Sequence, residues 1–168
     1  LNKSLIAAII GFALVAVYML IFYRFSGLIA DITLGIYVLI NISLYKTIPI
    51  TLTLSGIAGF ILSIGMAVDA NVLIFERTKE ELKMGQSLKN AIQIGFKRAW
   101  PSIRDGNLTT LIICFILYQF GTSSVKGFGI TLAIGVLTSM FSAMTITRTF
   151  MLKLADTKLE KHQKLWIK

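Results

Sequence analysis

The sequence predicts an all-α membrane protein, a five-transmembrane-helix bundle with one cytoplasmic interfacial amphipathic helix. Hydrophobic residues make up 55% of the 168-residue chain and charged residues only 15%, whereas soluble domains carry about 25% charged residues. The mean hydropathy is +0.77. Apolar runs long enough to cross a hydrocarbon core of about 30 Å recur along the chain. We therefore expect a transmembrane bundle over residues 1–152 and a basic cytoplasmic tail over residues 153–168.

The apolar runs give the order of the helices. The predicted spans cover residues 5–23, 27–45, 50–76, 104–120 and 127–151. The first has no small-residue cleavage site and is longer than a signal-peptide core, so we expect it to be retained. The short turn at 25–27 predicts an antiparallel return into the second span. Pro49 suits the first turn of the third helix, where its missing N–H is not needed. Because the chain opens with Leu1, we expect it to be a piece of a longer protein.

The connection between the third and fourth spans is the one sizeable loop. The third helix is expected to continue out of the membrane and to end at Gly85. Residues 87–100 then place apolar side chains on one helical face and polar side chains on the other. This pattern predicts an amphipathic helix in the cytoplasmic interface, anchored by Trp100 and ended by Pro101.

The distribution of basic residues predicts the orientation. Of the 17 Lys and Arg residues, only Lys3, Lys46 and Lys126 fall on one predicted side of the membrane. This bias predicts an external N-terminus and a cytoplasmic C-terminus. The net charge of +9 then reflects topology and attraction to anionic lipid headgroups of the bilayer. Aromatic and basic residues are not interleaved, so we expect no nucleic-acid partner.

Asp69 is the ionisable residue within the third apolar span. A charged carboxylate at this depth costs a few kcal/mol or more, so such residues usually face protein and usually serve a function. A carboxyl group held away from water favours its protonated form, whereas a nearby cation favours its charged form. We therefore predict that Asp69 is the proton-coupling residue. The alternative is a neutral structural carboxyl group hydrogen-bonded to Ser or Thr. No nucleophile–base pair, phosphate loop or metal cluster is apparent, so catalytic residues, metals and cofactors other than the proton are not expected.

Other polar residues are second-rank candidates for a proton path, with structural roles as the alternative. They are Asn71, Asp105, Asn107, Thr109 and Thr110. Asn71 lies about 200° round the helix from Asp69, so we expect it to serve packing rather than to form a dyad. Asp105 stands at the expected start of the fourth span, where N-terminal capping is the main alternative.

Small residues at a spacing of four predict the packing faces, because they let helix backbones approach closely in a membrane. One such series is Ser55, Gly59 and Ser63, and the other is Thr131, Gly135, Ser139, Ala143 and Thr147. Gly65 lies one turn before Asp69, where we expect it to leave room for a partner side chain or a water.

Several motifs together resemble a known family. They are GMAVDANVLIFERTKEEL at 65–82, IRDGNLTTLI at 103–112, GTSSVKGF at 121–128 and SMFSAMTITR at 139–148. In this order they resemble the C-terminal membrane region of the SecD family of the bacterial Sec export machinery. Ser55 departs from the family pattern, which typically has proline there.

The resemblance implies a fold and a function. The fold would be half of the pseudo-symmetric membrane domain typical of the resistance–nodulation–division (RND) superfamily, in the cytoplasmic (inner) membrane. The function would be proton-driven assistance to polypeptide translocation, without enzyme activity. The implied partners are SecF, the SecYEG translocon and the unfolded preprotein, with YidC and YajC as further candidates.

Two alternatives stay open beside this resemblance. One is half of an RND-type small-molecule exporter. Such exporters usually have two adjacent aspartates, whereas Ala70 follows Asp69 here. The other is a non-transporting scaffold for Sec or insertase components, in which Asp69 is structural.

Overall fold

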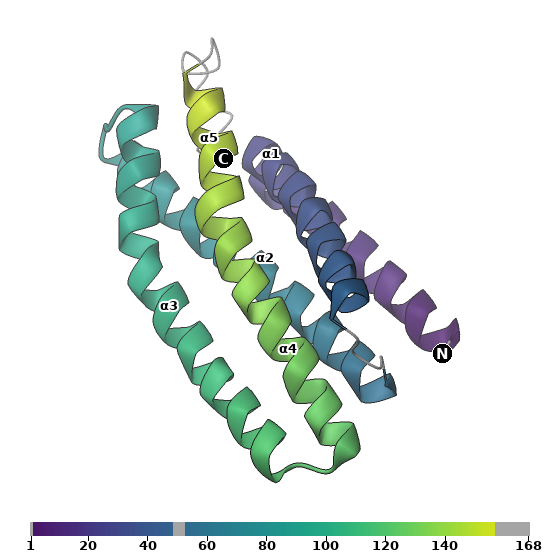
Figure 1. Ribbon diagram of the computed structural model, residues 1–168. Coiled ribbons are helices and arrows are strands. Elements are labelled where there is room, and N and C mark those ends of the chain that lie inside the picture. Colours follow the sequence, from purple (N-terminus) through teal and green to yellow (C-terminus); the bar gives the residue numbers. More distant parts are fainter. Residues whose placement is uncertain (1, 49–52, 157–168) are drawn as a thin grey trace.

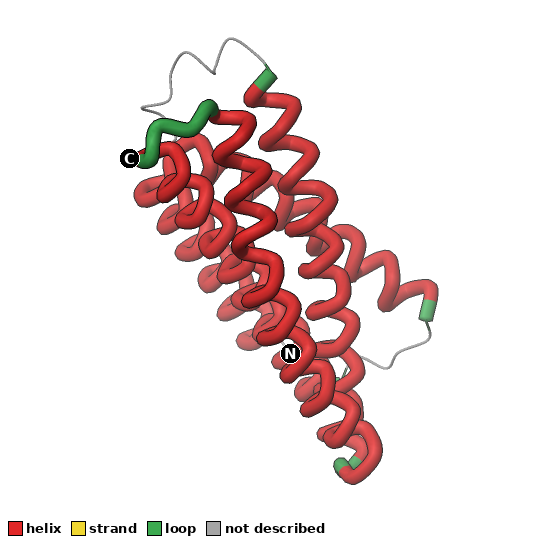
Figure 2. Tube along the Cα trace, turned by 90° about the vertical axis from the view of Figure 1, so that its left-hand side faces the viewer, coloured by secondary structure: helices red, strands yellow, loops and turns green. Residues whose placement is uncertain are grey.

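The computed structural model describes residues 2–48 and 53–156, and within these ranges the chain is built from helices joined by short connections (Figure 2). The elements are α1 Asn2–Thr47, α2 Leu54–Lys83, α3 Leu88–Phe120, α4 Ser123–Phe141, the π-helical turn η1 Ser142–Thr147, and α5 Arg148–Ala155. The predicted all-α class is confirmed for this part of the chain. Of the predicted basic tail, residues 157–168 lie outside the described residues.

The helix α1 consists of two arms that meet at Arg24. The backbone there has φ 45° and ψ −108°, an uncommon conformation for a residue with a side chain. The chain turns back so sharply that a Cβ on Gly27 would lie 2.1 Å from the carbonyl oxygen of Met19. Met19 and Ile29 share one hydrophobic cluster across the turn. The antiparallel return expected at 25–27 is therefore present, with the reversal at Arg24 (Figure 1).

The helix α2 is bounded by signals that can be read in the sequence. The hydroxyl of Thr53 accepts a hydrogen bond of 3.1 Å from the Gly56 N–H, which caps the first turn. Gly85 has φ +86°, and the Gln86 N–H donates to the carbonyl of Glu81, as in a glycine-ended helix. The predicted stop at Gly85 is confirmed. Pro49, expected in the first turn of this helix, lies outside the described residues, and α2 begins after it.

The small-residue faces lie against each other in the contact between α2 and α4. A Cβ on Gly59 would lie 2.6 Å from the Thr131 hydroxyl, and one on Gly135 would lie 2.2 Å from the Ser63 hydroxyl. Ser55 donates a hydrogen bond of 2.6 Å to the Ser124 carbonyl further along the same seam. These contacts follow one another in the same order along both helices, so α2 and α4 run in the same direction. The two backbones are therefore close enough that a methyl group at either glycine would require displacement.

The helix α3 corrects one prediction. Residues 87–100 do not form a separate interfacial helix ended by Pro101, because α3 runs through Pro101 to Phe120. Its apolar face is buried against the rest of the protein rather than in lipid, with Phe96 1% exposed and Ala99 fully buried. A Cβ on Gly95 would lie 2.4 Å from the Thr78 hydroxyl of α2. This packing holds both sides of the proline in one helix, although proline removes one backbone hydrogen bond.

The predicted number of spans is not confirmed. Within the described ranges, three stretches are long and apolar enough to cross a membrane: Ile9–Thr47, Leu54–Lys83 and Ser123–Ala155. The first contains both arms of α1, and the last contains α4, η1 and α5. The α3 stretch expected to be the fourth span is not among them, because Arg104, Asp105 and Asn107 lower the hydropathy at its beginning.

One interhelical contact was not expected from the sequence. Arg98 of α3 forms ion pairs with Glu80, at 3.3 Å, and with Glu81 of α2. Arg77 also pairs with Glu80, at 3.0 Å. The Glu81 side chain is only 9% exposed, so its charge depends on Arg98 for compensation. The two pairs of Arg98 join the end of α2 to the first half of α3.

Candidate functional site

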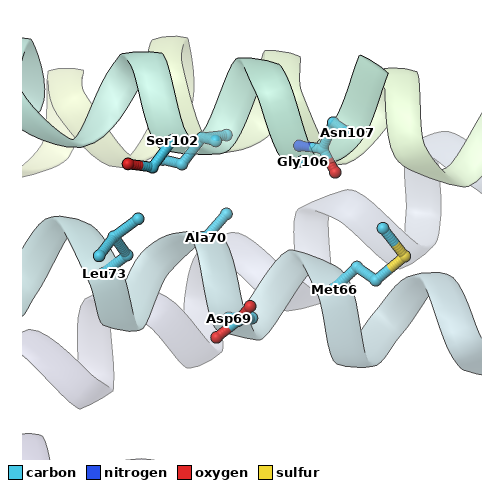
Figure 3. A pocket seen from close by; sticks show the side chains of 8 residues that line it. Met66, Asp69, Ala70, Leu73, Ser102, Gly106 and Asn107 are labelled. Atoms are coloured by element: carbon cyan, nitrogen blue, oxygen red, sulfur yellow. The ribbon is translucent and has the colours of Figure 1, made fainter. Parts of the chain in front are cut away.

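The predicted proton-coupling residue lies beside a cavity between two helices. The cavity measures about 190 Å³, which is space for a few water molecules. It is lined from α2 by Met66, Asp69, Ala70 and Leu73, and from α3 by Ser102, Ile103, Gly106 and Asn107 (Figure 3). The first half of α3, which packs tightly on α2, sets the spacing of the two helices here. The Ser102 hydroxyl and the Asn107 amide thus border the cavity from α3, and Asp69 lies at its edge on α2 with its carboxyl group directed at neither of them (Figure 3).

Within the described residues, no cation is paired with Asp69. No Lys, Arg or His lines the cavity. Asp69 is in none of the ion pairs formed within residues 2–48 and 53–156. Its side chain is exposed at the surface of α2, so a group from outside the chain could reach it.

The two glycines nearest the cavity leave space rather than pack. A Cβ on Gly65 or on Gly106 would meet no atom within 4 Å. Gly106 lines the cavity directly, whereas Gly65 is exposed one turn before Asp69. The expected room beside Asp69 is thus present in this chain, in contrast to the closely packed Gly59 and Gly135.

The second-rank candidates separate into different environments. Asn107 is 6% exposed and lines the cavity together with Asp69. Asn71 is 3% exposed and points elsewhere, where its side-chain oxygen accepts a hydrogen bond of 2.9 Å from the Thr147 hydroxyl. Thr109 and Thr110 donate hydrogen bonds to the carbonyls one turn earlier, at 2.9 and 3.2 Å, so their hydroxyl protons are engaged within α3.

The interpretation of Asp105 as a helix cap is wrong. Asp105 lies in the interior of α3, because the helix begins at Leu88 and is capped by the Ser87 hydroxyl, which accepts from the Asn90 N–H. Its exposed carboxylate is paired with the Arg104 side chain at 2.8 Å and does not line the cavity. The structure therefore does not bring Asp105 together with Asp69.

Two polar residues were missed by reasoning from the sequence. One is Ser102, which supplies the hydroxyl of the cavity. The other is Asp31 in the second arm of α1, away from the cavity lining, whose two carboxylate oxygens are buried without a hydrogen-bond partner among the described residues. The signal for Ser102 is its position one turn before Gly106 and Asn107 on the same face of α3.

Known proteins resemble both the sequence and the fold. Residues 1–157 match the family described as protein export membrane protein SecD/SecF, C-terminal. The chain is 55% identical to the protein translocase subunit SecD of Thermobaculum terrenum over 154 residues, which are 89% of this chain and 30% of that protein. It is 54% identical to the protein translocase subunit SecD of a Synechocystis strain over 152 residues, covering 90% of this chain and 32% of that protein.

A solved structure has the same fold. It is that of SecDF, a translocon-associated membrane protein from Thermus thermophilus, with a TM-score of 0.90 and 39% identity. The match covers 92% of this chain and 22% of that one. This chain thus spans about a third or less of the length of these three proteins.

Proposed function

The chain belongs to the SecD/SecF family of protein-export membrane proteins, and we propose that it forms the membrane region of a SecD-type subunit of the Sec machinery. Its identity of 55% and 54% to proteins named as translocase subunit SecD supports the SecD side of the family. In this proposal the subunit uses the proton gradient to assist movement of unfolded preproteins across the cytoplasmic membrane. It is a transport subunit and not an enzyme, and the proton is its coupling ion.

The proposed topology has five passes. They are the two arms of α1, then α2, the second half of α3, and the continuous run of α4, η1 and α5. The N-terminus would be external and the C-terminus cytoplasmic. Figure 1 shows the turn between the arms of α1, the α2–α3 connection and α5 at one end of the bundle. The sequence assigns 14 of the 17 basic residues to the cytoplasmic side, and the described ones among them belong to these segments and to the adjoining parts of α2 and α3, which supports this orientation.

The observation that carries the mechanism is the cavity beside Asp69, which has polar walls but no cation. Within the hydrocarbon region the charged form of Asp69 is costly, so loss or gain of its proton changes how α2 packs against its neighbours. The hydroxyl of Ser102 and the amide of Asn107 can hold water next to the carboxyl group, which gives the proton a way in. A change in packing of α2 would then be passed to the parts of the subunit that contact the preprotein.

The proposed partners follow from what this chain leaves uncovered. Asp69 and Gly65 are both exposed, and a bare carboxyl group facing lipid is unfavourable. We propose that a SecF-type half covers this face and supplies the opposite charge. The pair would associate with the SecYEG channel, with YidC and YajC as further candidate partners.

The test is export by the complete translocase containing the variant Asp69→Asn, measured in inverted membrane vesicles with and without a proton gradient. Asparagine keeps the shape of the side chain but fixes it in a neutral form. We expect normal assembly with the SecF-type half and loss of the gradient-dependent part of export. Asp69→Glu retains a titratable group and should restore part of it.

Asp105→Asn is the matched control, since this carboxylate is exposed and lies outside the cavity. We expect it to export at nearly the normal rate. Normal gradient-dependent export by Asp69→Asn would reject the coupling role and leave a scaffold as the better function. Normal preprotein export together with a loss of small-molecule efflux would instead favour an RND-type exporter.

A further inference from the structure

A second cavity lies between α3 and the helical run formed by η1 and α5. It measures about 470 Å³ and is lined by Gln93, Phe96, Lys97, Trp100, Met144 and Arg148. It shares no lining residue with the cavity beside Asp69. Its size falls within the range of small-molecule and lipid-headgroup sites, about 300–1,000 Å³. Nothing in the proposed coupling mechanism uses it.

The polar part of this cavity is suited to an anion. Lys97 comes from α3 and Arg148 from the first position of α5, so two different helices direct positive charge at one space. Neither side chain is in an ion pair with a residue of the described ranges, and no carboxylate lines the cavity. The neighbouring Arg98, by contrast, is held by Glu80 and Glu81. The amide of Gln93 adds a neutral hydrogen-bond donor beside the two cations.

The apolar part of the cavity favours an anion that also has an apolar portion. Phe96 is almost fully buried and forms its floor, and Met144 and Trp100 are partly exposed beside it. These apolar side chains form no hydrogen bond with a small hydrated anion such as inorganic phosphate. They do suit a molecule that carries an acyl chain next to its charge. The ligand that matches both parts is therefore an amphiphile with an anionic head.

The residues of this cavity share one face on each of the two helical segments. Within η1, Thr147 faces α2, where it is bonded to Asn71. Met144 and Arg148, four residues apart, both line the cavity on the α3 side. Positions four apart share one face of this run, as they do in an α-helix, and π turns are frequent at functional sites. On α3, the spacing of Gln93, Lys97 and Trp100 places them along one stripe.

We propose that this cavity binds the phosphate headgroup of an anionic phospholipid, with Lys97 and Arg148 on the phosphate and an acyl chain along Phe96 and Met144. Trp100 would lie at the level of the headgroups, where tryptophan is enriched. Basic pockets between membrane helices on the cytoplasmic side bind such headgroups. The proposal rests on the membrane setting and topology of the proposed function, but not on proton coupling by Asp69.

Lipid binding can be measured on the complete subunit with its SecF-type half, purified in detergent. Native mass spectrometry would compare retention of phosphatidylglycerol with that of phosphatidylcholine carrying the same acyl chains. We expect a preference for phosphatidylglycerol in the unaltered protein. In the double variant Lys97→Gln, Arg148→Gln this preference should fall by roughly 10- to 30-fold, since each basic residue near the headgroup contributes to the attraction. The charge-conserving variant Lys97→Arg, Arg148→Lys should keep most of it.

The matched control is Lys83→Gln, Lys153→Gln, which removes two exposed charges from the same end of the bundle but outside the cavity. An equal loss in the control would mean that diffuse surface charge attracts the lipid, and it would overturn the site. Displacement of the lipid by an excess of inorganic phosphate would also overturn it, in favour of a free anion. Because Asp69→Asn leaves the cavity intact, that variant should bind the lipid normally whether or not Asp69 couples protons.

Discussion

Thr147 donates a hydrogen bond of 2.9 Å to Asn71, which joins the end of η1 to α2 two residues after Asp69. Both side chains are almost fully buried, at 0% and 3% exposed. A hydrogen bond between buried polar groups fixes the rotation of one helix relative to the other, because breaking it leaves both groups unsatisfied. The direction in which α2 presents Asp69 is therefore set in part by this contact.

We predict that Thr147→Val destabilises the protein by about 1 kcal/mol, the range found for hydrogen bonds between membrane helices. Valine keeps the volume but leaves the Asn71 oxygen without its donor. The measurement is the midpoint of unfolding in mixed micelles, compared with the unaltered protein. Thr145→Val in the same turn is the control, because Thr145 is exposed and should change the midpoint little. Equal effects at both positions would show that the bond contributes nothing specific.

A larger effect is expected in the seam between α2 and α4. Gly135→Val should destabilise the protein by about 1–3 kcal/mol, because the new side chain would overlap with Ser63 and separate the two backbones. Thermal unfolding of the purified subunit would measure it. Gly35→Val is the control, since a Cβ there meets no atom within 4 Å. If the two variants unfold alike, the loss comes from helix propensity and not from close packing.

The sequence was a good guide wherever a local signal decided the structure. The glycine end of α2, the reversal near Arg24 and the two small-residue faces are all local patterns, and each is present. The open space beside Asp69 was also expected, because Gly65 lies one turn away on the same helix. These features can be predicted from periodicity and residue size alone, without knowing which helix packs against which.

The sequence was a poor guide where tertiary contacts decided. An amphipathic segment before a proline is equally compatible with an interfacial helix and with a helix packed on protein. Phe96 and its neighbours are buried against the rest of the bundle, so the segment packs on protein. That same continuity of α3 moved Asp105 from a helix start to a helix interior. The approach of α3 to the run of η1 and α5 has no local signal in the sequence, so the cavity lined by Lys97 and Arg148 could not be predicted.

Removal of Arg98 should destabilise the contact between α2 and α3. In Arg98→Ala the Glu81 carboxylate, only 9% exposed, loses its cation, and we expect a cost of about 1–3 kcal/mol, below that of a fully buried pair because Arg98 itself is 40% exposed. Chemical unfolding monitored by circular dichroism would measure it. The double variant Arg98→Ala, Glu81→Ala should recover part of the loss. Arg77→Ala is the control, and its half-exposed pair with Glu80 should contribute well under 1 kcal/mol.

The volume beside Asp69 can be tested separately from its charge. In Gly106→Leu an apolar side chain enters the cavity of about 190 Å³ and displaces water from the carboxyl group. Since a Cβ at Gly106 meets no atom within 4 Å, Gly106→Ala should be tolerated, and the leucine variant should still fold and assemble. We expect gradient-dependent export to fall several-fold with leucine and little with alanine, because water supplies the proton in the proposed mechanism.

Asn107→Leu should act in the same direction, since it removes the buried amide that borders the cavity. The control is Gly35→Leu, which adds the same side chain at an open position on α1. Export at the normal rate from a correctly assembled Gly106→Leu complex would mean that the proton reaches Asp69 by a route outside this cavity, from the side that the SecF-type half covers.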